Sequence, residues 1–347
     1  MRSISSFTAV ALSSLALAAC GSGGSSSGSR DFVRVVGSST VYPFSTAVAE
    51  SAAKSAGIKS PVIESTGTGA GMKLFCAGIG AQHPDVENAS RRMKLSEFEE
   101  CTKNGVKDII EIQIGIDGLA FAAGRDAPAM TLTPAEIYKA LAANPFGKRN
   151  TAKNWSDINP ALPAMPILVY GPPTTSGTRD SLAELILEKG CDTDPAMKAL
   201  KTSDKDAHKK VCTEVRSDGP YVDSGENDNL IVQKLAQNPK AIGAFGYSFL
   251  EENLKTLKGV PLSGIAPTYE TISDFSYPGA RAMYIYVKPA HLSAIKGLAE
   301  YMAEWPKVWG ADGLLKSKGM IVSPENVRAR YADVVTNKTL MNSADLK

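Results

Sequence analysis

Short runs of apolar residues alternate along the chain with stretches in which apolar residues recur at helical spacing. The runs are rich in Val, Ile and aromatic residues, which is typical of buried strands. This alternation predicts an α/β fold with mainly parallel sheets, because strand–helix–strand units place successive strands side by side. The expected strands are 32–36, 62–65, 167–170 and 282–287, and the expected helices are 44–56, 181–189 and a stretch that ends near Trp305.

Local signals also predict where some elements begin, break or end. The sequence Thr-Pro-Ala-Glu at 133–136 is a capping box with proline at the first helical position, so a helix should start there. Gly190 is expected to end the 181–189 helix, because glycine is a common C-terminal stop. The apolar and β-branched residues 109–123 predict strand structure that breaks at Asp117-Gly118.

Three turns combine hydroxyl residues and glycines with the start of a predicted helix. In α/β sheets ligands bind beyond the carboxyl ends of strands, where the first N–H groups of a helix lack internal partners. An oxyanion placed there accepts from hydroxyl and backbone donors together. One such turn is explained by ordinary capping, but three in one chain favour an anion site. The first turn is 37–43 (GSSTVYP), the second is 65–71 (STGTGAG) and the third is 174–179 (TTSGTR).

The second turn is not a nucleotide-binding motif. Gly67, Gly69 and Gly71 give GxGxG rather than GxGxxG, and the chain has no GxxxxGK[ST] sequence. Two arginines near the turns are candidate partners for an anion, since guanidinium presents two parallel N–H donors to an oxyanion. They are Arg91 in NASRR and Arg179 in SGTR; for Arg91 a solvated surface cation is the alternative.

The N-terminus reads as an export signal. Arg2 precedes a short apolar stretch that ends in Leu-Ala-Ala-Cys at 17–20, which resembles the lipobox of bacterial lipoproteins and implies a lipid-modified Cys20. An ordinary leader cut near Ala19 is the alternative. We expect residues 1–20 to be a leader and 21–30, rich in Gly and Ser, to be a flexible linker.

Composition adds two limits. The 347 residues, 43% of them hydrophobic, suggest about two domains. The charges almost cancel, with 38 Lys and Arg against 36 Asp and Glu, so nothing points to nucleic acid as a partner.

The remaining four cysteines fit an oxidising compartment. Their even number suggests two disulfides, and although three connectivities exist, we favour Cys76–Cys101 and Cys191–Cys212 because each pair is close in sequence. A zinc site is the rival. The chain has no CxxC spacing and its three histidines are far apart in sequence, so we expect neither a metal nor another cofactor.

Several motifs together resemble the phosphate-binding proteins of phosphate-specific ABC transporters, which are periplasmic solute-binding proteins of the type with two crossings between lobes. The matching segments are 37–44 (GSSTVYPF), 67–78 (GTGAGMKLFCAG), 88–94 (NASRRMK), 176–181 (SGTRDS) and 241–250 (AIGAFGYSFL). The resemblance implies two α/β lobes, here 31–116 plus 275–347 and 117–274, with phosphate buried in the cleft. By position it implies phosphate contacts from Ser39, Thr40, Val41, Thr68, Ser176, Gly177 and Thr178.

The chain departs from the best-known branch of that family at two charged positions. Arg91 stands where that branch has an aspartate, and Pro172 stands where it has an arginine. Another branch has Ser-Arg and Ser-Gly-Thr-Arg at these places, as here, which adds Arg91 and Arg179 to the implied site. A carboxylate that accepts the proton of hydrogen phosphate would reject sulfate. Asp117 is the candidate, with a purely turn-forming role as the alternative.

The resemblance implies a solute-binding protein in the periplasm or on the cell surface, without enzymatic activity. The lipobox implies the lipid anchor, and we expect a monomer. Its partners would be inorganic phosphate, the membrane permease of an ABC importer and, through the N-terminal lipid, the membrane surface. The alternatives are the same fold with sulfate or molybdate, a secreted phosphatase, and an adhesion or signalling protein. No GxSxG between a predicted strand and a predicted helix, and no HExxH motif, supports a hydrolase.

Overall fold

The computed structural model describes residues 29–174, 176–225 and 228–346. The predicted leader, the lipidation at Cys20 and most of the predicted linker lie outside these residues. Within the described ranges no helix combines the length and the apolar character needed to cross a membrane.

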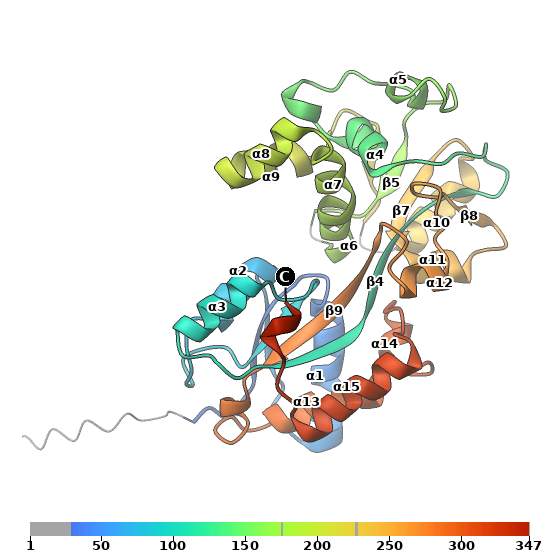
Figure 1. The fold of residues 1–347 in the computed structure, drawn as a ribbon. Helices are drawn as coiled ribbons and strands as arrows, with labels where there is room; N and C mark the ends of the chain where they lie inside the picture. The colour runs from blue at the N-terminus through green and yellow to red at the C-terminus, as the bar shows by residue number, and fades with distance from the viewer. Residues whose placement is uncertain (1–28, 175, 226–227, 347) are drawn as a thin grey trace, which may run out of the picture.

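The protein has two α/β lobes joined by long strands (Figure 1). Its described strands hydrogen-bond in the order β2-β1-β3-β9-β4-β7-β5-β6, and β8 also pairs with β4. The first lobe is built on β1, β2, β3 and β9, and the second on β5 to β8. The strands are β1 (Arg34–Gly37), β2 (Val62–Ser65), β3 (Val86–Ala89), β4 (Ile110–Gly124), β5 (Val169–Gly171), β6 (Tyr221–Asp223), β7 (Ile242–Gly246), β8 (Leu257–Gly259) and β9 (Ala280–Val287).

Helices cover the sheet in each lobe (Figure 1). The first lobe has α1 (Tyr42–Ala56), α2 (Thr68–Phe75), α3 (Leu95–Lys103), α13 (Leu298–Val308), α14 (Leu314–Ser317) and α15 (Glu325–Asn337). The second has α4 (Pro134–Leu141), α5 (Trp155–Ile158), α6 (Gly177–Ser181), a π-helical stretch (Leu182–Leu187), α7 (Glu188–Cys191), α8 (Pro195–Ser203), α9 (Lys205–Thr213), α10 (Asp228–Gln237), α11 (Tyr247–Glu252) and α12 (Tyr269–Ser273). Short 3₁₀ turns lie at Pro145–Gly147, Pro289–His291 and Ser343–Asp345.

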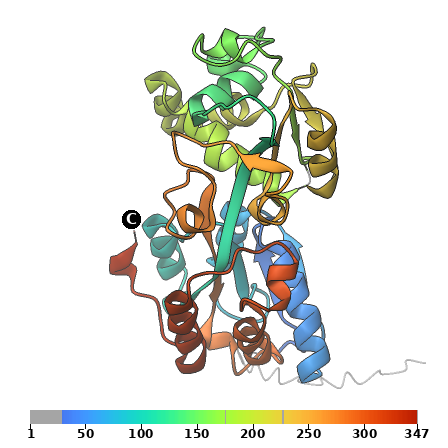
Figure 2. The same cartoon turned by 90° about the vertical axis from the view of Figure 1, so that its right-hand side faces the viewer.

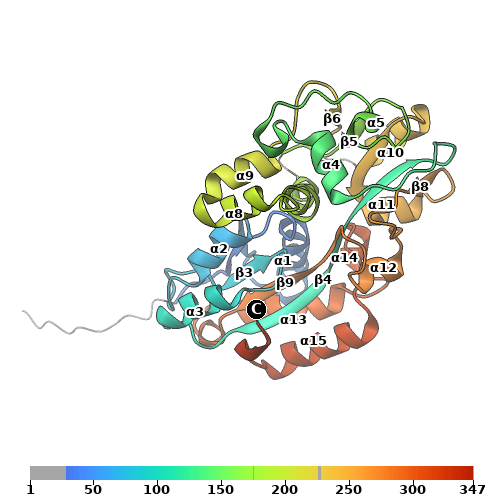
Figure 3. The same cartoon turned by 45° about the horizontal axis from the view of Figure 1, so that its top comes forward.

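The strand β4 runs through both lobes (Figure 2). Residues 110–118 pair with β9, and residues 119–124 pair with β7 and β8. The predicted break at Asp117-Gly118 is therefore wrong. Asp117 pairs with Arg281 and Gly118 with Ala280 in the ladder, so these two residues continue the strand. Figure 3 shows β4 and β9 side by side between the lobes.

The parallel strand pairs are those that lead toward the three turns. β1 is parallel to β2 and β3, and β5 is parallel to β6 and β7, whereas the pairs of β4 and the β3–β9 pair are antiparallel. Parallel strands bring their carboxyl ends to one edge of each lobe. The turns after β1, β2 and β5 consequently lie where the lobes meet.

Each lobe has its own hydrophobic core. Trp155 is among the buried residues of the second lobe and Trp305 among those of the first. A further cluster, with Phe75 and Tyr286, fills the space between the first-lobe sheet and α2 with α3. Separate cores let the lobes move as bodies while the crossing strands connect them.

Most local predictions are confirmed. Both disulfides form as expected, Cys76–Cys101 and Cys191–Cys212. The capping box starts α4, with the N–H of Glu136 donating to Thr133 Oγ1. Gly190 does not end its helix but lies inside α7. A Cβ there would stand 2.7 Å from the carbonyl carbon of Pro134, so close packing explains the glycine.

Candidate anion-binding site

The first turn carries the chain from β1 into α1. Gly37 has a positive φ of 124°, a conformation that glycine adopts without strain. The N–H of Ser38 donates to the carbonyl of Asn88 on β3. Val41 is the N-cap of α1, and its N–H lies 3.4 Å from Ser38 Oγ. Ser39 and Thr40 thus stand at the N-terminal end of a long helix.

The second turn meets the segment that follows β3. Gly67, with φ of 78°, is the N-cap of α2, and Thr68 is the first helical residue. Thr68 Oγ1 lies 3.1 Å from Ser90 Oγ and accepts from the N–H of Ser90 at 3.1 Å. These contacts place Ser90, and Arg91 after it, beside the N-terminus of α2.

The third turn lies in the second lobe, and it touches the first turn. Ser176 is the N-cap of α6 and accepts from the N–H of Thr178. Thr40 Oγ1 donates to the carbonyl of Gly177 at 3.2 Å, and Ser39 Oγ donates to the carboxylate of Asp180. The structure therefore brings two of the predicted turns together across the two lobes.

Arg281, which the sequence analysis did not single out, is the most connected side chain at this junction. It is the second residue of β9, and its side chain is 8% exposed. Nε donates to Asp117 Oδ2 at 2.9 Å, and Nη2 donates to Thr40 Oγ1 at 3.1 Å. Nη2 also donates to Ser181, and Nη1 contacts Glu184. One guanidinium on a crossing strand thus binds residues of both lobes.

The two predicted arginines lie nearby but are held by other groups. Arg91 forms two hydrogen bonds with Glu97, at 2.6 and 2.8 Å, and its side chain is 31% exposed. The guanidinium of Arg179 lies 4.4 Å from the ring centre of Tyr221, whose hydroxyl donates to the carbonyl of Pro172. Burial raises the pKa of Tyr221 to about 12, so this phenol is neutral.

Asp117 is bonded within the protein. Its Oδ2 accepts from Ser181 Oγ at 2.6 Å as well as from Arg281, and its side chain is 14% exposed. The carboxylate has a structural role in joining β4 to α6 and β9. Its role toward a ligand proton stays a prediction, and Asp180 is a second carboxylate at the same junction.

A second cluster has the elements of a metal site. Glu188, Asp192 and His208 place one ligand atom each within 4.8 Å of one another. Lys201 Nζ binds both carboxylates, and His208 Nε2 lies 2.7 Å from Asp192 Oδ1, so these groups already satisfy one another. The neighbouring Cys191 and Cys212 form a disulfide and offer no thiolate.

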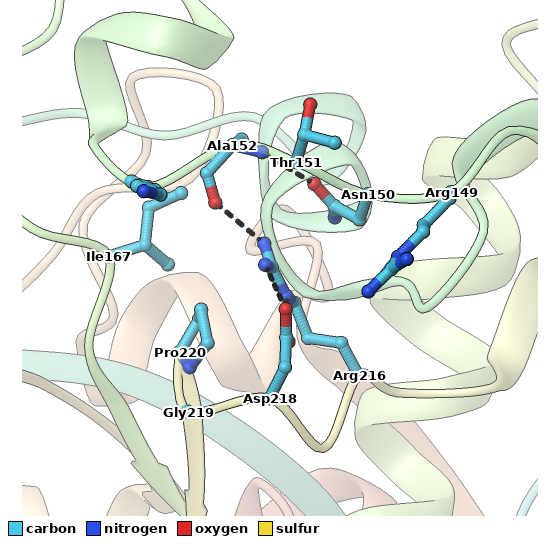
Figure 4. A pocket seen from close by; sticks show the side chains of 10 residues that line it. Arg149, Asn150, Thr151, Ala152, Ile167, Arg216, Asp218, Gly219 and Pro220 are labelled. Atoms are coloured by element: carbon cyan, nitrogen blue, oxygen red, sulfur yellow. Dashed lines mark hydrogen bonds and ion pairs between the residues drawn. The ribbon is translucent and has the colours of Figure 1, made fainter.

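A separate open hollow lies at the amino ends of β5 and β6, away from the three turns (Figure 4). Arg149, Lys153 and Arg216 line it together with Asp218. Figure 4 shows Arg216 bonded to Asp218 and to the carbonyl of Ala152. Through these bonds Arg216 stabilises the loop that contains Asp218.

The fold, with two lobes joined by crossing strands and hydroxyl-rich helix N-termini between them, defines a solute-binding protein. The family model described as the PBP superfamily domain matches residues 22–304. A solved structure of similar fold is titled a possible phosphate binding protein from Planctomyces limnophilus. It has a TM-score of 0.69 and 29% identity, and the match covers 88% of this chain and 98% of that one.

Relatives with higher sequence identity place the chain in one family of the superfamily. Protein SphX of Synechococcus elongatus is 34% identical over 75% of this chain and 69% of its own. The phosphate-binding protein PstS of Staphylococcus saprophyticus is 31% identical over 83% of this chain and 81% of its own. The chain therefore belongs to the PBP superfamily and, within it, to the family of these PstS and SphX proteins.

Proposed function

We propose that this chain is an extracytoplasmic solute-binding lipoprotein that captures inorganic phosphate between its lobes and delivers it to an ABC importer. The observation that supports this proposal most directly is the contact between the first and third turns, where Thr40 hydrogen-bonds to Gly177 and Ser39 to Asp180. A ligand at this junction would touch both lobes, so binding would favour the closed arrangement.

The donor set suits a tetrahedral oxyanion. Hydroxyl groups at the N-termini of α1, α2 and α6 provide directed donors, and Arg91, Arg179 and Arg281 provide positive charge. We propose that phosphate contacts Ser39, Thr40, Val41, Thr68, Arg91, Ser176, Gly177, Thr178 and Arg179, with Asp117 as acceptor of the ligand proton. The PstS relative is named a phosphate-binding protein, which supports this choice of anion.

Export and anchoring are part of the same proposal. The two disulfides fit an oxidising compartment, and the Leu-Ala-Ala-Cys sequence supports lipid attachment at Cys20. Anchored protein would stay near a membrane permease while its lobes bind and release solute. We propose a monomer with lobes formed by 31–116 plus 275–347 and by 117–274, and no catalytic activity of its own.

A thermal-shift panel tests the ligand. Residues 29–347 are heated with phosphate, sulfate, molybdate or no anion, and ligand at a hundredfold excess over its dissociation constant stabilises the native state by about 2.7 kcal/mol. We expect a shift with phosphate. A shift with sulfate or molybdate alone would identify that anion, rather than phosphate, as the ligand. Turnover of a chromogenic phosphate ester would contradict a function in binding alone.

A further inference from the structure

Glu87 on β3 is a buried acid that the proposed phosphate contacts do not use. Its side chain is fully buried, and neither carboxyl oxygen has a hydrogen-bond partner among the described residues. An unpaired carboxylate in such a place is costly, because nothing replaces the water it loses. The protonated, neutral form of the Glu87 side chain is therefore favoured.

The carboxyl group lies where the first and second turns touch. A Cβ added at Gly37 would stand 2.7 Å from Glu87 Oε1, and one added at Gly71 would collide with Glu87 Oε2 and lie 2.5 Å from Gly37 Cα. Gly37 starts the first turn, and Gly71 lies one helical turn, about 5 Å, beyond Thr68 in α2. Both glycines let the backbones close around this acid.

Two charged groups of the described residues, Glu97 and Arg91, act on Glu87 electrostatically. Burial, with a further contribution from Glu97, raises the pKa of Glu87 well above its ordinary value, and Arg91 acts against them. The titratable groups on β3 and on the elements next to it are Tyr286 on β9, the exposed Lys73 on α2, Asp85 just before β3, Arg91 and Lys94 before α3, Glu97 on α3, and the Arg34–Glu64 ion pair on β1 and β2. Neither Arg91 nor another described cation bonds to Glu87, since Arg91 is bound to Glu97.

We propose that Glu87 is a positioning residue of the anion site, a neutral carboxylic acid that sets the spacing between the first turn and the N-terminus of α2. An ionised Glu87 would place a negative charge one helical turn behind Thr68 and repel a bound anion. Anion binding and protonation of Glu87 therefore favour each other. This proposal rests on the proposed function, since it assumes that these two turns hold phosphate.

The test compares Glu87→Gln with Glu87→Ala. Glutamine keeps the volume and stays neutral at every pH, so its affinity for phosphate should match wild type at low pH. As pH rises, wild type should weaken relative to Glu87→Gln by about fivefold or more. Alanine removes the spacer, and affinity should fall about tenfold or more at every pH. Calorimetric titration with inorganic phosphate measures the affinity of all three proteins. Comparison with Glu87→Gln removes the pH dependence that comes from the ionisation of phosphate itself.

Two further measurements keep the outcome decisive. The infrared band of a protonated carboxylic acid should be present in wild type at neutral pH and missing from Glu87→Gln, whether or not the alanine variant folds. Glu304→Gln is the matched control, because Glu304 is another buried acid of the first lobe that binds Ser51, Ser55 and Lys307, and its phosphate affinity should follow the wild-type pH profile.

Three results would overturn the proposal: no such band in wild type, the same pH profile in wild type and Glu87→Gln, or full affinity in a folded Glu87→Ala. A wild type that binds no phosphate would instead refute the proposed function, and the proposal for Glu87 with it.

Discussion

Thr40 and Gly177 form a backbone contact between the two lobes. Thr40 Oγ1 donates to the carbonyl of Gly177 at 3.2 Å, and a Cβ on Gly177 would stand 2.5 Å from Thr40 Cα. The N-terminal ends of α1 and α6 therefore approach as closely as glycine allows, and the lobe closure that we propose depends on this position.

Gly177→Ala should weaken phosphate binding about tenfold or more, because the added methyl group meets the backbone of Thr40 and holds the lobes apart. Stability should change little, since the clash is relieved when the lobes open. Calorimetry and thermal unfolding measure the two effects. Gly310→Ala, where the nearest atom to a new Cβ is 3.9 Å away, is the control and should bind normally. Normal binding by Gly177→Ala would contradict the role of this contact.

Arg281→Met should reduce phosphate affinity by about 2 kcal/mol or more, as truncation of a buried, hydrogen-bonded charge does. The change also leaves Asp117 without its cation, so Arg281→Lys should restore only part of the affinity. Arg149→Ala, in the hollow of Figure 4, is the matched control and should bind as wild type.

Arg91→Ala and Arg179→Ala should each weaken phosphate binding by more than ~2 kcal/mol, because each removes a cation that we propose binds the anion directly. Arg91 is bound to Glu97 and Arg179 lies over Tyr221, so these two contacts set the positions of both guanidinium groups. Unchanged affinity in both variants would mean that phosphate binds in another pocket.

Local features were predictable from the sequence and long-range ones were not. The disulfides and the α4 cap join residues at most 25 positions apart, so spacing was enough to find them. Arg281 meets Asp117 across 164 positions, and nothing near GARAM in the sequence signals that pair. The same long-range ladder continues β4 through Asp117-Gly118, where local preference predicted a break.

Replacing either cysteine pair with alanine should lower the free energy of unfolding by about 3 kcal/mol, because each disulfide closes a loop of similar length, with separations of 25 and 21 residues. Urea unfolding of Cys76→Ala/Cys101→Ala and Cys191→Ala/Cys212→Ala measures the losses. Equal stability of a variant and wild type would show that its disulfide does not form in the folded protein.

Lys288 should make stability depend on alkaline pH. Its Nζ donates to the carbonyls of Gly78 and Pro84, and burial lowers its pKa to about 7. Between pH 7 and the unfolded pKa near 10.4, the unfolded chain binds the proton and the native chain does not. Stability should therefore rise with pH by about 1 kcal/mol per unit.

Lys288→Met lacks this titration and serves as the reference. Urea unfolding of both proteins at pH 7 and pH 9.5 should show wild type gaining stability relative to the variant. A constant difference between them would mean that Lys288 stays charged in the folded protein.

The central claim is that one phosphate binds between the lobes. Calorimetric titration of phosphate into ligand-free residues 29–347, with sulfate titrated in parallel, tests it most directly. The account predicts one phosphate per chain, with little heat from sulfate and with phosphate affinity weaker by about 2 kcal/mol or more in Arg281→Met. Absence of phosphate binding by a folded wild type, or equal binding by wild type and Arg281→Met, would contradict it.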